Sequence, residues 1–314
     1  MLNNNKTIKV ILDTDNGDDI DDLFTLYILL NDPKFEVIGI ISSYLNTPLR
    51  ARQIRHVLKL KGREDIPVFA GCGQTIKGLH DRPSNIVFWQ YSEVLDKKEY
   101  FNLKDSPDGE LAIDFLIESA KKYKDELYIV GVAPETTIAK AIEKNKEAFK
   151  NCHFYLMGGS FYQNCSEWNI ECDYEAAKIV ATSDLDIHYC GLDVTRSTFL
   201  PDYIYQQFIN IKKDEYTNYL IETTKLWNSF SKRNPTLHDP LTLLSTVYDV
   251  VQYREMNVRL DINLDTRKTV FESCEADKDF HSVKVAYSID IQRTFKLIFE
   301  LLGLDKEILL KETY

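Results

Sequence analysis

Short, continuous apolar segments recur along the chain and constrain its fold more than any other feature. They are rich in Val, Ile, Leu and aromatic residues, and they lie at 9–12, 36–41, 127–132, 152–157 and 186–190. Segments of this length without polar alternation are typical of strands that are buried on both faces. Such strands occur inside parallel sheets, because helices cover both sides of those sheets.

Helical periodicity fills the intervals between the predicted strands. Ile54, Val57 and Leu58 fall at positions i, i+3 and i+4, and the same spacing recurs after the segment 127–132. Apolar residues at 111, 115 and 117 indicate another helix before that segment. A strand followed by a helix and another strand indicates βαβ units. The order of these patterns therefore predicts an α/β fold with a mainly parallel sheet flanked by helices.

The second half of the chain continues this organisation without an obvious boundary. The region 200–250 has helical patterns, a further strand is expected at 283–288, and a last helix is expected at 291–303. The 314 residues contain no Pro/Gly/Ser-rich linker and no internal repeat, and 44% of them are hydrophobic. We therefore predict one large α/β domain over 1–314.

Charge and cysteine content exclude several classes of function. The net charge is −11, and phosphate binding needs clustered cations, so neither nucleic acid nor an anionic membrane is an expected partner. The most apolar run, at 23–30, is far shorter than the roughly 20 residues of a membrane span. The N-terminus has no signal-peptide pattern. Six cysteines without a CxxC pair predict reduced thiols and a cytoplasmic location.

An acidic turn follows the first predicted strand and precedes the apolar helix DDLFTLYILL. It carries six carboxylates within ten residues, at Asp13, Asp15, Asp18, Asp19, Asp21 and Asp22. Two carboxylates about 4 Å apart repel by about 4 kcal/mol at an effective dielectric constant of 20, so a bound cation is expected. Oxygen ligands suit Ca²⁺ or Mg²⁺. A solvated turn that caps the helix explains only two or three of the six.

A second polar cluster lies far along the chain, in the segment HDPL. His238 and Asp239 precede Pro240 and an apolar helix. The aspartate is placed to complete a metal site from across the sheet, and the histidine to exchange a proton near neutral pH. Alone, the segment is explained by helix capping. Together with the acidic turn, it indicates an active site.

With both clusters considered, the chain resembles the inosine–uridine-type nucleoside hydrolase family over nearly its whole length. The resembling segments are ILDTDNGDDIDDLFTL (11–26), GVAPETTIAKAI (131–142), LMGGSF (156–161), SEWNIECDYEAAKIV (166–180), GLDVT (191–195) and HDPL (238–241). The resemblance implies a Rossmann-like core and a Ca²⁺-dependent hydrolase. Such an enzyme cleaves the N-glycosidic bond of ribonucleosides to free base and ribose, serves purine and pyrimidine salvage, and forms a homodimer or homotetramer.

The resemblance also assigns roles to individual residues. It implies that Asp15 binds Ca²⁺ and is the base for the attacking water, and that His238 is the acid for the leaving base. The further Ca²⁺ ligands that it implies are Asp22, the backbone carbonyl of Thr136, and Asp239. The ribose-binding residues that it implies are Asp21, Asn46, Glu167 and Asn169.

Three departures from the family pattern bear on these assignments. The acidic turn is two residues longer than usual, so Asp18 and Asp19 compete for the roles of Asp21 and Asp22. We prefer the later pair because it abuts the apolar helix, and we expect Asp18 and Asp19 to form an exposed lip of little consequence. Thr137 replaces the usual Asn. The loop 159–167 lacks its usual Asn early on, and Gln163 and Asn164 are possible substitutes.

Two other functions and several single residues stay open. In a haloacid-dehalogenase-type phosphatase, Asp13 would be the nucleophile and Asp15 the acid/base, with Mg²⁺; a non-catalytic nucleoside-binding protein of the same fold is the other alternative. Base preference is expected to depend on the loop 72–92 and the stretch 200–235. For His80 we favour a position in a surface loop over one in the base pocket. We expect core packing for Trp89 and Trp227, whereas Trp168 is a candidate for base stacking. His56 is expected at the surface, and His153 and His188 are expected in the core.

Overall fold

One sheet runs through the part of the chain that the computed structural model describes, which comprises residues 7–76, 94, 97–163, 165–211, 214–263, 268–273 and 281–303. Its strands are β1 (Ile8–Thr14), β2 (Phe35–Ser42), β3 (Val68–Ala70), β4 (Leu127–Gly131), β5 (His153–Met157), β6 (Asp186–Cys190), β7 (Val251–Asn263), β8 (Lys268–Ser273) and β9 (His281–Ile289). All six strands predicted from apolar segments are present.

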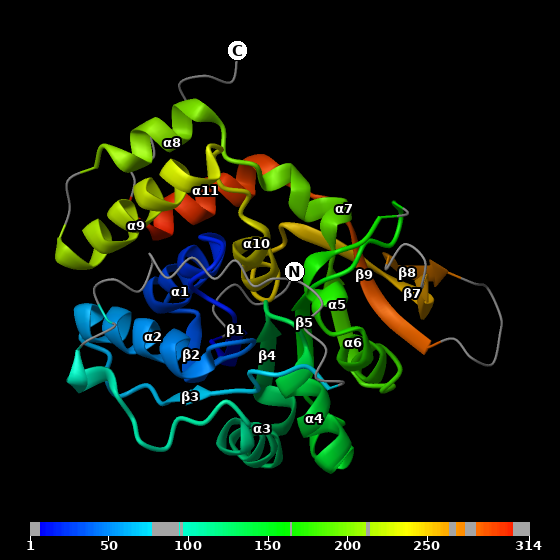
Figure 1. Cartoon of the computed structure of the whole chain (residues 1–314). Helices are drawn as coiled ribbons and strands as arrows, with labels where there is room; N and C mark the ends of the chain where they lie inside the picture. Colours follow the sequence, from blue (N-terminus) through cyan, green and yellow to red (C-terminus); the bar gives the residue numbers. More distant parts are fainter. Residues whose placement is uncertain are drawn as a thin grey trace.

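The strand order is β3-β2-β1-β4-β5-β6-β9-β7-β8 (Figure 1). The neighbours from β3 to β9 pair in parallel, whereas β7 pairs antiparallel with both β9 and β8. The predicted, mainly parallel sheet is therefore confirmed. The antiparallel β7–β8 hairpin at one edge was not predicted.

Helices cover both faces of the sheet and form two apolar cores with it. One face carries α1 (Asp21–Asn31), α2 (Thr47–Lys61), α8 (Asp202–Ile209), α9 (Glu215–Ser231), α10 (His238–Leu244) and α11 (Ile291–Leu301). The other carries α3 (Glu110–Tyr123), α4 (Thr136–Asn145) and α6 (Tyr174–Ala181). The short helices α5 (Trp168–Cys172) and α7 (Leu192–Thr195) follow β5 and β6.

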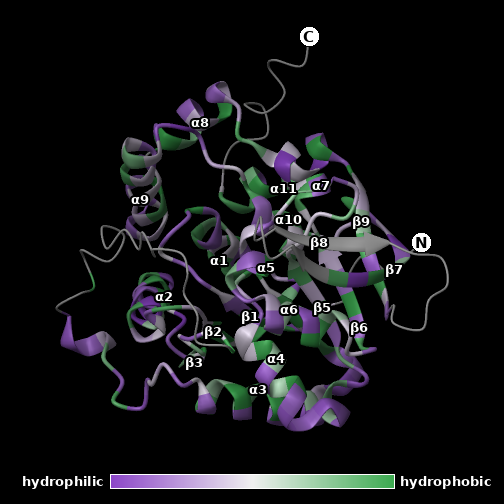
Figure 2. Ribbon diagram, turned by 45° about the vertical axis from the view of Figure 1, so that its right-hand side comes forward, coloured by the Kyte–Doolittle hydropathy of each residue, from purple (hydrophilic) through white to green (hydrophobic). Residues whose placement is uncertain are grey.

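Strand β1 shows why its sequence is apolar throughout. Val10 and Leu12 pack in the core under α1 and α2, whereas Ile11 packs in the core under α3 and α4. Figure 2 shows the complementary pattern in the surrounding helices, which carry both hydrophilic and hydrophobic residues. None of the helices in the described ranges combines the length and apolarity that crossing a bilayer requires.

The order of the strands places a crevice beside β1. Strand β1 lies between β2 and β4, so the chain winds outward from it in opposite directions. In open parallel sheets, ligands bind at such a switch point, beyond the carboxyl ends of the strands. The acidic turn leaves β1 at this end and leads directly into α1.

Candidate active site

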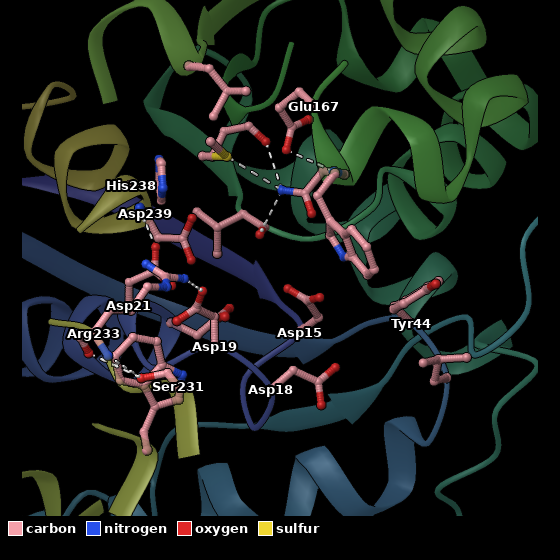
Figure 3. A pocket seen from close by; sticks show the side chains of 18 residues that line it. Asp15, Asp18, Asp19, Asp21, Tyr44, Glu167, Ser231, Arg233, His238 and Asp239 are labelled. Carbon is pink, nitrogen blue, oxygen red and sulfur yellow. Dashed lines mark hydrogen bonds and ion pairs between the residues drawn. The ribbon is translucent and has the colours of Figure 1, made fainter. Parts of the chain in front are cut away.

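A cavity of about 700 Å³ opens at the switch point. Residues that follow β1, β2, β4, β5 and β6 line it, together with residues from α9, α10 and the segment between them. They are Asp15, Asp18, Asp19, Asp21, Asp22, Tyr44, Leu45, Val132, Met157, Glu167, Trp168, Asn169, Leu192, Trp227, Ser231, Arg233, His238 and Asp239 (Figure 3). The cavity thus joins both polar clusters that the sequence singled out.

Three buried carboxylates form the centre of the site. Asp21, Asp22 and Asp239 each offer an oxygen, and these oxygens all lie within 4.8 Å of one another. The backbone N–H of Asp239 donates to Asp21 Oδ2 at 3.3 Å, and Thr14 Oγ1 donates to Asp22 Oδ1 at 2.5 Å. Asp15 lines the same cavity. The fold therefore brings α10 to the acidic turn across more than two hundred residues of sequence.

Burial makes this cluster unfavourable as a set of bare anions. It raises the pKa of Asp15 to about 7, and burial together with the neighbouring aspartates raises the pKa values of Asp21, Asp22 and Asp239 well above the usual range. A cation would favour the ionised carboxylates, as metal ligands must be deprotonated. A set of oxygen donors fits a hard divalent ion such as Ca²⁺ or Mg²⁺.

The backbone ligand expected at Thr136 does not belong to the cavity lining. Thr136 begins α4, and its hydroxyl donates to Asp173 Oδ2 at 2.6 Å. Val132, directly after β4, lines the cavity instead. Its backbone N–H donates to the Asp13 carbonyl at 2.8 Å, which fixes Val132 beside the acidic turn. The structure therefore places Val132, and not Thr136, in the cavity lining.

Two of the expected ribose-binding residues line the cavity beside α5. The Glu167 carboxylate caps α5 and accepts the backbone N–H groups of Asn169 at 2.9 Å, Ile170 at 3.1 Å and Gly159 at 3.1 Å. Burial raises the pKa of Glu167 to about 7, although these three donors oppose the shift. The Asn169 amide donates to the carbonyls of Val132 and Met157 at 3.2 and 3.0 Å. Both side chains are thus held rigidly.

Asn46, the third expected ribose ligand outside the acidic turn, does not line the cavity. Its side chain is exposed and caps α2 by accepting the N–H of Leu49 at 3.3 Å. The preceding residues Tyr44 and Leu45 line the cavity, with φ angles of 70° and 59°. Non-glycine residues rarely adopt this left-handed conformation, and such strain is concentrated at functional sites.

His238 lies at the start of α10, beside the carboxylate cluster. Its Nδ1 atom is 2.7 Å from Thr195 Oγ1, so Nε2 is the ring nitrogen left for a substrate. Burial, together with the charges of Arg233 and Arg196, lowers the pKa of His238 to about 4. The ring is therefore mainly neutral at pH 7, which opposes a simple role as proton donor.

The two extra carboxylates of the acidic turn differ from each other. Asp19 is half-exposed, as expected for a lip. Asp18, in contrast, pairs with Arg50 at 2.6 Å, and the Arg50 side chain is 0% exposed. Arg50 also donates to the carbonyl of Tyr44 at 2.8 Å, to that of Asn16 at 2.9 Å and to that of Asp15. The expectation that Asp18 forms part of an exposed lip is therefore wrong.

The remaining expectations divide between residues inside and outside the described ranges. Trp168 lines the cavity and is 48% exposed, as a base-stacking residue would be; Trp227 is buried, as predicted, yet also lines it. The Gln163 side chain accepts from Arg196 at 2.9 Å and lies away from the cavity lining. The predictions for His80, Trp89 and Asn164 concern residues outside the described ranges.

Several lining residues were missed by sequence reasoning. Tyr44, Val132 and Leu192 directly follow buried strands, and the rule for carboxyl ends of parallel strands was sufficient to find them. Arg233 follows α9 in a polar segment, and its sequence carries no comparable signal.

Comparison with known proteins decides the family. The profile of the inosine–uridine preferring nucleoside hydrolases matches residues 10–296. The chain belongs to this family. The probable uridine nucleosidase 2 of Arabidopsis thaliana is 31% identical over 315 residues, covering 93% of this chain and 96% of the relative.

Solved structures of nucleoside hydrolases share the fold. A plant nucleoside hydrolase has a TM-score of 0.80 at 27% identity, covering 95% of this chain and 99% of its own. A purine-preferring ribonucleoside hydrolase from Gardnerella vaginalis has a TM-score of 0.79 at 25% identity, with the same coverage. These similarities confirm the predicted family and fold class and support an N-glycosidic hydrolase. They support neither the phosphatase nor the non-catalytic alternative.

Proposed function

We propose that this protein hydrolyses the N-glycosidic bond of ribonucleosides to free base and ribose, with one Ca²⁺ ion bound at the acidic turn. The observation that carries the proposal is the buried cluster of Asp21, Asp22 and Asp239 beside Asp15, at the switch point of a nucleoside hydrolase fold. The group consists of three buried carboxylates and contains no lysine or arginine, and such a group favours a divalent cation.

The proposed metal ligands are Asp15, Asp22, Asp239 and the carbonyl of Val132. When bound, the ion supplies positive charge that binds ribose hydroxyls and acidifies a water molecule. Asp15 accepts the proton of the attacking water. Asp21 accepts a hydrogen bond from a ribose hydroxyl close to the metal.

Glu167 and Asn169 complete the ribose site from the opposite wall. Their own hydrogen bonds to backbone groups hold both side chains in place, so little conformational entropy is lost when the sugar binds. The transition state resembles an oxocarbenium ion, and the surrounding carboxylates stabilise its positive charge. Asn46 belongs to this site only if the segment before α2 moves inward.

His238 is the proposed acid for the leaving base, through Nε2. Thr195 holds the ring from the other side at 2.7 Å. The pKa of His238 is low in the free protein. When substrate binds, His238 must therefore take up a proton, or other groups must polarise the base.

The wider setting of the enzyme belongs to the same proposal. We place it in nucleoside salvage in the cytoplasm, which fits the absence of disulfides among the five cysteines of the described ranges. The family resemblance favours a homodimer or homotetramer, which sedimentation velocity measures directly.

A panel of nucleosides tests the proposed reaction. Purified protein is incubated with uridine, cytidine, inosine and adenosine, and free ribose is measured as reducing sugar. We expect ribose from at least one nucleoside with wild-type protein and none with Asp15→Asn. No ribose from any of the four would reject the proposal, and so would full activity of Asp15→Asn.

A further inference from the structure

The guanidinium of Arg233 faces the acidic cavity. Among the described residues that line it, seven carry carboxyl groups, whereas Arg233 alone is an arginine or lysine. A guanidinium is always charged and offers five N–H donors but no acceptor. Arg233 therefore gives one wall of the cavity a chemistry that its other residues lack.

Two contacts hold this guanidinium at the mouth. Arg233 Nη2 lies 3.5 Å from Asp19 Oδ2, and Arg233 Cζ lies 5.1 Å from the ring centroid of Trp227. Asp19 is itself fixed, because its Oδ1 accepts the backbone N–H of Ile20 at 2.7 Å. The Arg233 and Asp19 side chains are 50% and 43% exposed, so water and substrate reach them.

The position of Arg233 relates it to the leaving base rather than to the attacking water. Figure 3 shows Arg233 and Ser231 on the same side of the cavity as His238, whereas Tyr44 and Glu167 lie on other sides. Trp227, also in the lining, offers an aromatic face beside the guanidinium. An aromatic ring and a planar cation together suit a flat, polar heterocycle.

The reaction creates a need for such a group. As water attacks C1′, the bond between C1′ and the base nitrogen breaks, and its electron pair moves onto the base. The water proton goes to Asp15, and the proton that neutralises the base, assigned above to His238, arrives after negative charge has begun to develop on the base. In uracil or hypoxanthine, the negative charge spreads to exocyclic carbonyl oxygens, which accept hydrogen bonds.

We propose that Arg233 binds an exocyclic carbonyl oxygen of the base and stabilises the negative charge that develops there, with Asp19 and Trp227 as positioning residues. This inference rests on the proposed hydrolase activity. It assigns to this chain a leaving-group residue that its family motifs do not include. It also assigns a function to Asp19, which belongs to the part of the acidic turn that exceeds the usual family length.

The test compares Arg233→Gln with Arg63→Gln, an exposed arginine that is paired with Asp65 outside the cavity lining and serves as the matched control. Substrates are uridine, 5-fluorouridine and p-nitrophenyl riboside, whose leaving groups need progressively less stabilisation. Arg233→Gln should lower kcat/KM for uridine by about 10- to 100-fold, mainly through kcat, as for loss of one oxyanion-stabilising donor. The loss should be smaller for 5-fluorouridine and under about threefold for p-nitrophenyl riboside.

Two companion variants sharpen the result. Arg233→Lys should recover part of the uridine activity, and Asp19→Asn should lose a few-fold with the same order of substrates. Calcium affinity should be unchanged in Arg233→Gln, which separates this role from that of the metal site. An equal loss on all three substrates, no loss, or the same loss in Arg63→Gln would overturn the inference while leaving the hydrolase proposal intact. No hydrolysis by wild type would overturn both.

Discussion

The ion pair between Asp18 and Arg50 makes a quantitative prediction about the acidic turn. In Asp18→Asn, the Arg50 guanidinium, which is 0% exposed, loses its carboxylate partner at 2.6 Å. Removing one partner of a buried pair costs about 3–5 kcal/mol, because the other charge stays buried with less compensation. The Asp18 side chain is 29% exposed and backbone carbonyls still accept from Arg50, so we expect the lower limit, about 3 kcal/mol.

Asp19→Asn is the matched control, because it removes the neighbouring carboxylate of the same turn. Its partner, Arg233, is 50% exposed and 3.5 Å away, and exposed pairs contribute about 0–1 kcal/mol. Equilibrium urea unfolding of chelated protein measures both variants. Asp18→Asn should lower the free energy of unfolding by about 3 kcal/mol, and Asp19→Asn by less than about 1 kcal/mol.

A double variant separates charge pairing from loss of packing. Asp18→Asn combined with Arg50→Gln should cost clearly less than the sum of the single changes, because no charge stays unpaired. Asp18→Asn should also weaken Ca²⁺ binding, since Arg50 holds the carbonyls of Asp15 and Asn16. Equal destabilisation by Asp18→Asn and Asp19→Asn would refute this explanation of the turn.

Three further predictions concern the site. His238→Ala should slow nucleoside cleavage by about 10²-fold or more but p-nitrophenyl riboside much less, in steady-state assays; equal losses would make His238 structural. Glu167→Gln should lower the free energy of unfolding by about 1–3 kcal/mol and raise KM, since three backbone N–H groups lose a carboxylate acceptor; unchanged urea curves would contradict this. Because burial raises the pKa of Asp15 to about 7, Ca²⁺ must displace a proton below that pH; calorimetry should find weaker binding at pH 6 than at pH 8, and equal affinities would argue against Asp15 as a ligand.

Sequence reasoning predicted the parts of the fold that have a clear local pattern of apolar residues. Strand β1 is apolar at Val10, Ile11 and Leu12 because its two faces pack into two different apolar cores, and the other inner parallel strands are also buried on both faces. Strand β7 has no such signal, because it lies near the edge of the sheet and reads QYREMNV, with charged residues among the apolar ones. An antiparallel strand of this kind is hard to distinguish from a polar loop.

Burial of polar side chains was the least predictable property. His56 was expected at the surface of an amphipathic helix. It is buried, with Nδ1 2.8 Å from the hydroxyl of Tyr100, a residue 44 positions further along. His188 is buried as predicted, whereas His153 is partly exposed and pairs with Asp186 at 2.6 Å. Such pairings depend on contacts between distant segments, which a single sequence does not encode locally.

Some residues of the site were predictable from the sequence, and others were not. Asp21, Asp22 and Asp239 were found because carboxylates crowded at a strand end are unfavourable without a cation, and they do converge. Thr136, the expected backbone ligand, lies outside the cavity lining, because a carbonyl group has no residue type and its position follows from backbone geometry alone. Arg50 escaped notice because an arginine in a helix is normally solvated.

Turnover measured against calcium occupancy tests the central claim most directly. Chelated wild-type protein is titrated with Ca²⁺ while ribose release from its best nucleoside is followed, with Asp22→Asn measured in parallel. We expect no release without metal, activity that rises with occupancy and saturates at one Ca²⁺ per chain, and neither binding nor activity in Asp22→Asn. Ribose release that persists after chelation, or an Asp22→Asn variant with full activity, would contradict a calcium-dependent hydrolase built on these carboxylates.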